Sequence, residues 1–456
     1  MEAAASRAAG EVRASNGVRR QAGHHWLVRR TEAFVRTGRV SHRPTGWRDG
    51  SGCLPAGYGA PMPECSGPAT VVFDRSLTEY DFGPAHPMSP IRVDLTMRLA
   101  EELGVLDHGL RIVPAPMADE TRIATVHDPR LIAAVERAGT TPGVLDEEFG
   151  LGTDDNPTFR GMHHAAAHIV GASVEAFRQV WTGESLHAVN ITGGLHHAMR
   201  DRASGFCIYN DVAVGIQYLL DQGAQRVAYV DIDVHHGDGV ERIFWDDPRV
   251  LTISLHETGQ MLFPGTGFPN DVGGPEARGS AVNVALPPGT GDAGWLRAFH
   301  AVVPPLLREF DPDVLVTQHG CDSHIEDPLA HLMLTVDGQR AAYLALHDLA
   351  HEVAGGRWVV TGGGGYALVE VVPRAWTHLL AVVGGHPLDP ATDTPDGWRA
   401  HVRDGLQRTP PYRMTDGRNP AWRDWSEGYD PETWLDRAIH ATRTEIFPWH
   451  GLDPSP

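Results

Sequence analysis

The sequence predicts an α/β fold in which helices cover both faces of a mostly parallel sheet. Apolar runs rich in Val and Ile recur from about residue 70 onward, and helix-like stretches separate them. Near-continuous apolar strands that alternate with helices are typical of parallel sheets buried on both faces. In such folds ligands bind beyond the carboxyl ends of the strands, and this chain places its polar residues there.

The expected strands and helices follow one another in chain order. Strands are expected in the runs VVFD (71–74), HAVNITGG (187–194), RVAYVDID (226–233), RVLTISLH (249–256), DVLVTQHG (313–320) and RWVVTGGGG (357–365). Helices are expected between them, with residues 159–180 and 341–356 as examples. A chain of 456 residues that is 41% hydrophobic is long enough to bury a core of this kind.

Three segments are expected along the chain. Residues 1–69 are rich in Ala, Arg, Gly and Pro without sustained periodicity, which predicts a disordered or non-native extension, with a basic targeting arm as the alternative. Residues 70–395 carry the alternating pattern of the main domain. Residues 396–456 hold five of the twelve tryptophans. We expect this segment to pack on the main domain through its aromatic side chains, with a partner-binding surface as the alternative.

Composition narrows the classes of partner. The formal net charge of -20 argues against nucleic acid as the main partner. No apolar run reaches the roughly 18 residues of a membrane helix, so no membrane partner is expected. The four cysteines form no CxxC pair and no disulfide framework, which favours a cytoplasmic location. The sequence leaves the oligomeric state open.

The stretch YVDIDVHHGDG, residues 229–239, places titratable side chains at the end of a buried strand. In an extended chain alternate residues share a face, so Asp231, Asp233 and His235 point the same way. A buried carboxylate is costly unless a cation or a hydrogen-bond donor satisfies it. An Asp-x-His pair offers one oxygen and one nitrogen ligand, which suits zinc or ferrous iron. The alternative is that these groups hydrogen-bond a neighbouring loop.

A third ligand should come from another strand end. Asp322 follows the apolar run 314–316, and His319 and His324 compete with it for this position. Two carboxylates and one imidazole would leave coordination positions open, which is typical of catalytic metal sites.

Two further motifs carry acid–base and oxyanion chemistry. The adjacent His196 and His197 follow a strand that ends in NITGG, and in a loop both can face one cavity. Different carboxylate partners, for which Asp231 and Asp238 are candidates, would push the two imidazole pKa values apart and create a base and an acid. Tyr366 follows four glycines that lack the Gly-Lys-Ser/Thr of a phosphate loop. Its hydroxyl is a candidate to stabilise an oxyanion.

Together these motifs resemble those of the histone deacetylase superfamily. The resemblance spans roughly residues 70–395 and rests on YDFGPAHPMSPIR, FGLGTDDNP, GGLHHAMRDRASGFCIYND, YVDIDVHHGDG, SLHETGQMLFPGTG, HGCDSHIEDP and GGGGY, in family order. The chain is most similar to the bacterial acetoin-utilization deacetylase-like branch, as the YDFGPAHPMSP opening and the Trp-containing tail indicate. One departure is Leu262, where eukaryotic members commonly carry Phe.

The resemblance implies an arginase/deacetylase-type three-layer α/β/α sandwich with a sheet of about eight strands. It implies Zn²⁺, or Fe²⁺ as the alternative, held by Asp233, His235 and Asp322. The implied catalytic residues are the tandem histidines with their carboxylates and the tyrosine that polarises the acyl carbonyl: His196, His197, Asp231, Asp238 and Tyr366.

The resemblance also implies substrate-binding residues and a second cation. The substrate-binding residues are Asp154 at the rim, Gly205, Phe206 and Phe263 in the tunnel walls, and Arg92 in an inner product channel. A K⁺ site is implied at Asp231, Asp233, His235, Ser254 and Leu255.

The implied activity is metal-dependent hydrolysis of an ε-N-acetyl or short acyl group on lysine in proteins, with a link to acetoin or acetate metabolism. One alternative is an amidohydrolase for small N-acetyl amines of the acetylpolyamine type, which the acidic main domain would favour. The other is a non-catalytic acyl-lysine-binding protein, against which the complete set of catalytic positions counts.

Overall fold

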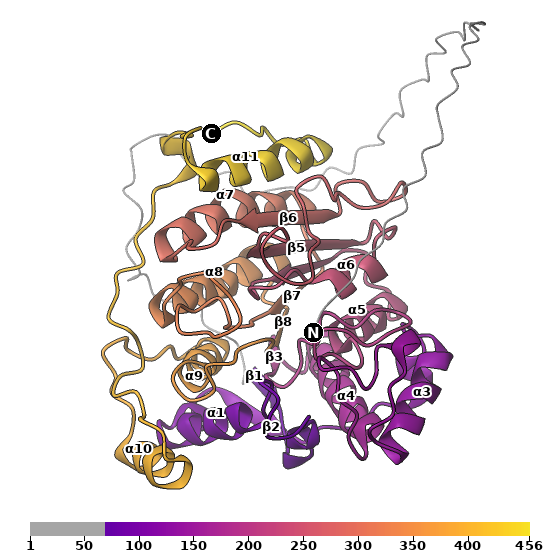
Figure 1. The fold of residues 1–456 in the computed structure, drawn as a ribbon. Coiled ribbons are helices and arrows are strands. Elements are labelled where there is room, and N and C mark those ends of the chain that lie inside the picture. The colour runs from indigo at the N-terminus through magenta and orange to yellow at the C-terminus, as the bar shows by residue number, and fades with distance from the viewer. Residues whose placement is uncertain (1–68) are drawn as a thin grey trace, which may run out of the picture. The chain divides into compact units, whose positions relative to one another are not determined.

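A computed structural model describes residues 69–456, and a parallel sheet of eight strands forms its centre (Figure 1). The strands are β1 (Ala69–Val72), β2 (Leu110–Val113), β3 (His187–Asn190), β4 (Val227–Asp231), β5 (Val250–Glu257), β6 (Ala281–Leu286), β7 (Val314–Gln318) and β8 (Trp358–Thr361). Their order in the sheet is β2-β1-β3-β8-β7-β4-β5-β6. The predicted α/β/α sandwich with a parallel sheet of about eight strands is confirmed. The expected N-terminal extension lies outside the described residues, apart from Ala69.

Helices connect the strands and cover both faces of the sheet. The α-helices are α1 (Ile91–Glu102), α2 (Glu120–Ile123), α3 (Pro129–Thr140), α4 (Met162–Trp181), α5 (Asp211–Asp221), α6 (Asp238–Ile243), α7 (Asp292–Phe310), α8 (Val336–Ala354), α9 (Val372–Val383), α10 (Asp396–Ala400) and α11 (Trp434–Ile446). Figure 1 shows α1, α7, α8 and α9 on one side of the sheet and α4 and α5 on the other.

Local sequence sets where the longer helices begin and end. The Thr335 side chain accepts a hydrogen bond from the Gly338 amide and caps the start of α8. Gly355, with a φ of 60°, ends the same helix in the left-handed conformation that glycine adopts without strain. Asn210 caps α5 by accepting from the Ala213 amide.

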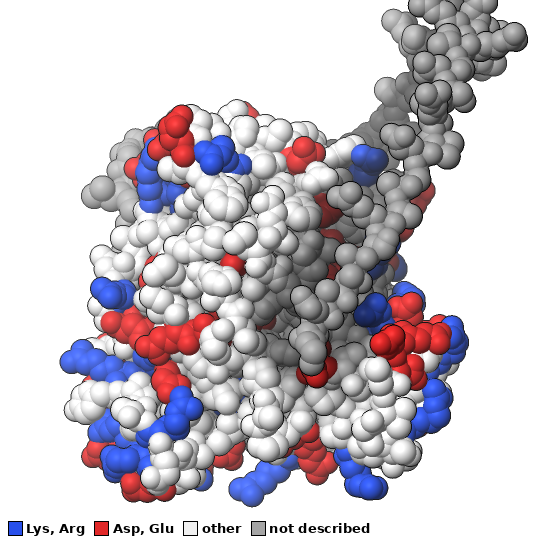
Figure 2. All heavy atoms as spheres, in the orientation of Figure 1, with Lys and Arg blue, Asp and Glu red and all other residues white. Residues whose placement is uncertain are grey.

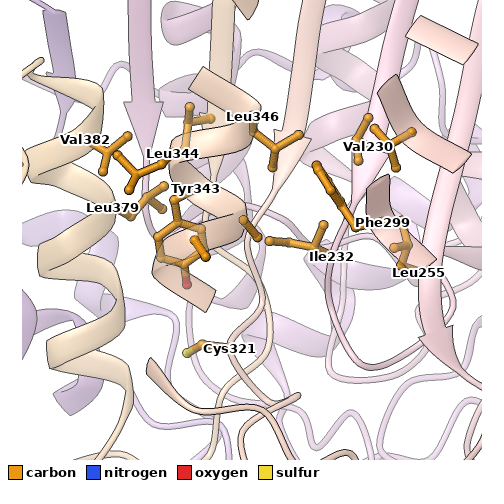
Figure 3. Close-up of a cluster of buried hydrophobic side chains, with 14 of the residues drawn as sticks. Val230, Ile232, Leu255, Phe299, Cys321, Tyr343, Leu344, Leu346, Leu379 and Val382 are labelled. Carbon is orange, nitrogen blue, oxygen red and sulfur yellow. The ribbon is translucent and has the colours of Figure 1, made fainter. Parts of the chain in front are cut away.

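Alternate residues of the central strands belong to two hydrophobic clusters, one on each face of the sheet. In β4, Ala228 and Val230 pack with residues of α7, α8 and α9, whereas Val227 and Tyr229 pack with residues of α4 and α5. Figure 3 shows part of the first cluster, in which Val230 of β4 and side chains from α7, α8 and α9 form one layer. Burial on both faces explains why the strands read as continuous apolar runs and not as alternating ones.

Several contacts hold the C-terminal segment against the main body, including two that involve large buried side chains. Trp398 is fully buried and donates from Nε1 to the Leu95 carbonyl of α1 at 3.0 Å. Arg297 of α7 is buried, and its guanidinium donates to both Asp436 carboxylate oxygens of α11 at 2.8 Å. Of the other tryptophans in this segment, Trp425 is buried and Trp434 and Trp449 are exposed.

The surface carries charges of both signs. On the face shown in Figure 2, arginine and acidic side chains lie side by side around the margin, and much of the centre is uncharged. None of the helices in the described part of the chain combines the length and the apolar character that a bilayer crossing requires.

Candidate active site

Four central strands bring the predicted site residues to one edge of the sheet. Strands β3, β8, β7 and β4 are neighbours and run parallel, so their carboxyl ends meet. The tandem histidines follow β3, the Asp-x-His pair follows β4, Asp322 follows β7 and Tyr366 follows β8. This is the edge at which parallel sheets of this type bind ligands.

A buried cluster of metal-ligating side chains lies at this edge. Asp233, His235 and Asp322 each offer one ligand atom, and these atoms all lie within 4.8 Å of one another. His235 Nδ1 is 3.2 Å from Asp233 Oδ1 and 3.2 Å from Asp322 Oδ2. The two competitors face elsewhere: His319 Nδ1 lies near a carbonyl at the end of β8, and His324 contacts a carboxylate of the C-terminal segment. The structure therefore groups Asp322, and neither histidine, with the Asp-x-His pair.

The surroundings of the two carboxylates fit a divalent metal. The Asp233 and Asp322 side chains are fully buried. Asp233 Oδ2 accepts hydrogen bonds from Gln318 Nε2 and from the Gly364 amide, each at 2.8 Å. Burial and repulsion from Asp233 raise the pKa of the Asp322 carboxyl, a conflict that a shared cation would remove. A Cβ atom at Gly320 or Gly364 would overlap one of the carboxylates, so glycine at these positions leaves room around the ligand atoms. Two carboxylates and an imidazole are donors that zinc accepts.

The tandem histidines each contact a separate aspartate. His196 Nδ1 lies 2.7 Å from Asp231 Oδ2, and His197 Nδ1 lies 2.7 Å from Asp238 Oδ1. Their Nε2 atoms face each other at 3.0 Å. The Tyr229 hydroxyl also donates to Asp231 Oδ2, at 2.6 Å. Each aspartate accepts an Nδ1–H and so directs the Nε2 of its histidine into the site.

The two imidazoles differ in protonation. Burial opposes charge on His196, but the nearby Asp231 and Asp233 carboxylates outweigh burial and raise its pKa to about 9. Burial and repulsion from the charged His196 lower the pKa of His197 to about 4, even though Asp238 acts in the other direction. Near neutral pH the pair therefore carries one positive charge, on His196, and His197 is neutral.

A narrow cavity leads from the surface to the metal-ligating cluster. Its outer part has a volume of about 210 Å³ and is lined by Asp155, His197, Gly205, Phe206, His235, Leu262, Phe263, Leu329 and Tyr366. A smaller space of about 20 Å³ continues inward, shares five of these residues, and adds His196, Asp233 and Met88 to the lining. The tandem histidines and two of the metal-ligating side chains thus open onto one path from solvent.

The walls of this cavity are aromatic and held from behind. The Phe263 ring lies 5.0 Å from the His197 ring, and the Phe206 ring lies 5.7 Å from the Tyr366 ring. Phe206 has a φ of 67°, an uncommon conformation for a bulky residue. The Tyr80 hydroxyl donates to the Phe206 carbonyl at 2.8 Å and accepts from the Ile208 amide at 3.0 Å. These two hydrogen bonds hold the Phe206 loop in place.

Tyr366 presents a neutral phenol to the cavity. Its backbone amide donates to Asp327 Oδ2 at 2.8 Å, which fixes the start of the turn after the four glycines. Burial and the Asp322 and Asp233 carboxylates raise the pKa of the Tyr366 hydroxyl well above its ordinary value. The hydroxyl therefore keeps its proton and is able to donate a hydrogen bond.

Arg92 and Asp154, the other two residues predicted to bind substrate, lie away from the main cavity lining. Arg92 is buried, donates to the Gly365 carbonyl at 3.1 Å, and lines a separate space of about 20 Å³ that shares Met88 with the inner cavity. Asp154 is exposed, and its neighbour Asp155 is the one that lines the cavity mouth.

The residues named for a monovalent cation lie at and just after the end of β4 and in the middle of the neighbouring β5. Asp231 and Ser254 are paired in the register of these two strands. The Ser254 hydroxyl contacts His256 Nδ1 at 2.8 Å, and Leu255 is buried beside it. Asp231 thus lies between the histidine pair on one side and Ser254 of β5 on the other.

The comparisons with known proteins identify the family. The Histone deacetylase domain matches residues 86–383. The Acetoin utilization protein AcuC of Bacillus subtilis (strain 168) is 42% identical over 329 residues, which cover 72% of this chain and 84% of that protein. The chain belongs to the histone deacetylase family. This family generally uses a metal, and the match includes every residue of the buried cluster.

Further histone deacetylase family relatives agree. AcuC of Staphylococcus xylosus is 37% identical over 332 residues, covering 72% of this chain and 85% of the relative. AcuC of Staphylococcus aureus (strain MSSA476) is 36% identical over 331 residues, covering 72% and 84%. The predicted resemblance to the acetoin-utilization branch of the family is confirmed.

Sequence reasoning missed several residues that the structure places at this histone deacetylase site. Gln318 contacts Asp233, and Asp327 accepts from the Tyr366 amide. Tyr80 holds the Phe206 loop, and Asp155 lines the mouth of the cavity. Gln318 is a polar residue at the end of β7, and Asp327 is a carboxylate within the motif HGCDSHIEDP, so each offered a signal in the sequence. Tyr80 lies far from Phe206 in the chain, and nothing in its local sequence indicates this contact.

Proposed function

We propose that this histone deacetylase family protein is a metal-dependent amidohydrolase that removes acetyl or short acyl groups from the ε-amino group of lysine in proteins. One observation carries the proposal: the buried metal-ligating cluster, the carboxylate-backed histidine pair and Tyr366 adjoin one narrow, aromatic-walled path from solvent. Zn²⁺ is the proposed ion at Asp233, His235 and Asp322, with Fe²⁺ as the alternative. K⁺ is proposed beside Asp231 and Ser254.

Amide hydrolysis needs an activated water and an activated carbonyl. A divalent metal, when bound, supplies Lewis acidity for both. His197 is neutral near pH 7 and lines the outer cavity, so it is the proposed base that takes a proton from water. His196 carries a proton under the same conditions, and its Nε2 lies 3.0 Å from that of His197. It is the proposed source of the proton that the leaving amine requires.

The other residues bind and orient the substrate in this proposal. The Tyr366 phenol donates to the oxygen of the acyl group as negative charge develops on it. Phe206 and Phe263 enclose the aliphatic lysine stem, which is neutral at its acylated end and therefore suits aromatic walls. Asp155, at the mouth, is the proposed acceptor for backbone amides of the substrate in place of Asp154.

A second candidate substrate class is favoured by charge at the mouth. Asp155 lines the opening and Asp154 lies exposed beside it, and paired acidic residues attract cationic amines. Acetylated polyamines therefore remain the alternative to acetyl-lysine proteins. The relatives are named as acetoin utilization proteins, and we propose the same physiological context here.

The test is a substrate panel on enzyme of defined metal content. Protein stripped by a chelator is reloaded with Zn²⁺, or with Fe²⁺ without oxygen, and kcat/KM is measured on an acetyl-lysine peptide and on acetylspermidine. We expect turnover of the peptide that returns on reloading and is inhibited by a hydroxamate. A higher kcat/KM for acetylspermidine would move the assignment to the alternative. Full metal loading with measurable ligand affinity but no turnover of either substrate would contradict an enzymatic role.

A further inference from the structure

Three histidines meet near the amino-terminal ends of the strands, whereas the candidate active site lies at their carboxyl-terminal ends. His187 is the first residue of β3, whose other end leads to the tandem histidines. His347 and His351 lie on the last two turns of α8. The three side chains each offer one ring nitrogen, and these nitrogens all lie within 4.8 Å of one another.

The arrangement of the rings matches a coordination site. His347 and His351 are four residues apart on one helix and share a face, and the third imidazole comes from a strand. The ring centres lie 5.0 Å (His187–His347), 5.1 Å (His187–His351) and 4.7 Å (His347–His351) apart. His187 Nε2 lies 3.2 Å from His351 Nε2. Tetrahedral zinc with Zn–N bonds of about 2.0–2.1 Å separates its nitrogen ligands by about 3.3–3.4 Å.

The tautomer of His187 is set for metal binding. Its Nδ1 lies 2.9 Å from the Val383 carbonyl, which can only accept, so Nδ1 carries the hydrogen. With Nδ1 protonated, Nε2 carries the lone pair of the neutral ring, and this atom faces His351. Ligating histidines typically donate their other N–H to a carbonyl in this manner. Metal ions bind neutral imidazole and compete with protons for it.

The position of the cluster favours a cation. His187 and His347 are buried and His351 is half-buried, so His351 is the most solvent-exposed of the three. The ring of Trp358 lies nearly perpendicular to the rings of both buried histidines, with ring centres 5.4 and 5.8 Å away. The cluster also lies near the C-terminal end of α8, where the helix dipole favours positive charge.

We propose that His187, His347 and His351 form a second metal site that binds a divalent transition metal such as Zn²⁺. A metal held there joins the amino end of β3 to the end of α8. Because unfolding would disperse the three ligands, metal binding stabilises the folded protein by mass action. This site is separate from the proposed catalytic metal, which lies beyond the opposite ends of the strands.

The test counts metal ions on the full chain. Chelator-stripped protein is titrated with Zn²⁺ and with Co²⁺, and bound equivalents, the Co²⁺ absorption spectrum and Tm are recorded. His351→Gln, at the half-buried position, removes one ligand, and His108→Gln replaces an exposed histidine as the control. We expect His351→Gln to bind one equivalent fewer than wild type and to lose part of the metal-dependent rise in Tm. His108→Gln should match wild type.

A third variant tests ligation directly. His351→Cys keeps a ligand at the same position, so it should recover the lost equivalent and add a thiolate-to-Co²⁺ charge-transfer band. Equal stoichiometry in wild type and His351→Gln would overturn the proposal, as would a His351→Cys variant that lacks the band. If the proposed catalytic site binds no metal, the number of bound equivalents falls equally in wild type and in every variant. The difference in bound equivalents between wild type and His351→Gln therefore reports on the three-histidine site alone.

Discussion

His196 and His197 are adjacent in the chain and face each other through their Nε2 atoms at 3.0 Å, yet each Nδ1 bonds a different aspartate at 2.7 Å. The separate partners give the rings opposite protonation, with pKa values of about 9 and about 4. One dipeptide thereby holds a charged and a neutral imidazole at the same site.

The neutral member of the pair should be the more critical base. We expect His197→Ala to lower kcat by about 10²–10⁴, the usual contribution of a positioned general base. Steady-state kinetics on an acetyl-lysine peptide measures the change. His164→Ala, at an exposed position of α4, is the control and should leave kcat unchanged. A His197→Ala enzyme with wild-type kcat would remove this residue from the mechanism.

Tyr366→Phe should separate oxyanion stabilisation from metal binding. Loss of one oxyanion donor typically costs about 10²–10³ in kcat, and the hydroxyl is not among the metal-ligating groups. We therefore expect near-inactive protein with an unchanged metal content. Tyr412→Phe removes a hydroxyl at a 60% exposed position and should have no effect. Turnover close to wild type in Tyr366→Phe would assign the oxyanion to other donors.

Removing one carboxylate should empty the proposed catalytic metal site. Asp322→Ala leaves two of the three ligand atoms and should reduce bound Zn²⁺ by one equivalent per chain, as measured by elemental analysis. Activity should fall to background in the same sample. Asp107→Ala changes an exposed carboxylate and should keep the wild-type count. Retention of that equivalent in Asp322→Ala would show that the ligands are assigned wrongly.

Stability should decrease as the pH falls below about 6.5. Burial lowers the pKa values of several histidines to about 3 or 4, namely His127, His187, His300, His319 and His378. Between the ordinary and the lowered pKa, the unfolded chain binds protons that the folded protein excludes. Each such histidine therefore lowers the free energy of unfolding by about 1.4 kcal/mol per pH unit of acidification in that range.

Chemical denaturation at pH 7.5, 6 and 5 checks this pH dependence. His300→Phe is a useful variant because His300 stacks on Trp422 at 4.2 Å between ring centres, and a phenyl ring keeps the stacking without binding a proton. Its stability should fall less steeply with acidification than that of wild type. Identical slopes, or constant stability down to pH 5, would contradict the prediction.

The Arg297–Asp436 contact should hold the C-terminal segment in place. The buried Arg297 guanidinium donates to both Asp436 oxygens and to three backbone carbonyls of that segment. Breaking a buried pair by removing one partner costs about 3–5 kcal/mol, so Arg297→Ala should lower the free energy of unfolding by about that amount. Arg308 lies on α7 like Arg297 and forms an exposed pair with Glu352 of α8, so Arg308→Ala should cost at most about 1 kcal/mol. Denaturant titration distinguishes the two, and equal losses would count against the structural role.

The central strands of the sheet could be predicted from the sequence, but its edges could not. The six expected runs correspond to β1, β3, β4, β5, β7 and β8. The two strands without a predicted run, β2 and β6, are the two edges of the sheet. β2 is half-exposed and therefore lacks a continuous apolar pattern. β6 reads AVNVAL and is buried because α11, from the distant C-terminal segment, packs against it.

The candidate site shows the same division. The Asp-x-His pair and the tandem histidines lie within single motifs, so local spacing was enough to single them out. The contact of Tyr80 with the Phe206 carbonyl and the position of Asp155 at the cavity mouth join segments far apart in the chain. Both residues lie within motifs that carry the family resemblance, but residue spacing within those motifs does not indicate either position.

By itself, the sequence determined the α/β class, the motifs at the strand ends and the family, because burial on both faces and ligand chemistry both leave local patterns in a chain. Residue spacing left Asp322, His319 and His324 open, and the family resemblance favoured Asp322. Only the tertiary structure brings the Asp322 carboxylate to within ligand distance of Asp233 and His235. It alone brought His187 together with His347 and His351. The reason is physical: ligation and hydrogen bonding depend on separations of a few ångströms, which the packing of helices on the sheet sets and residue spacing along the chain does not.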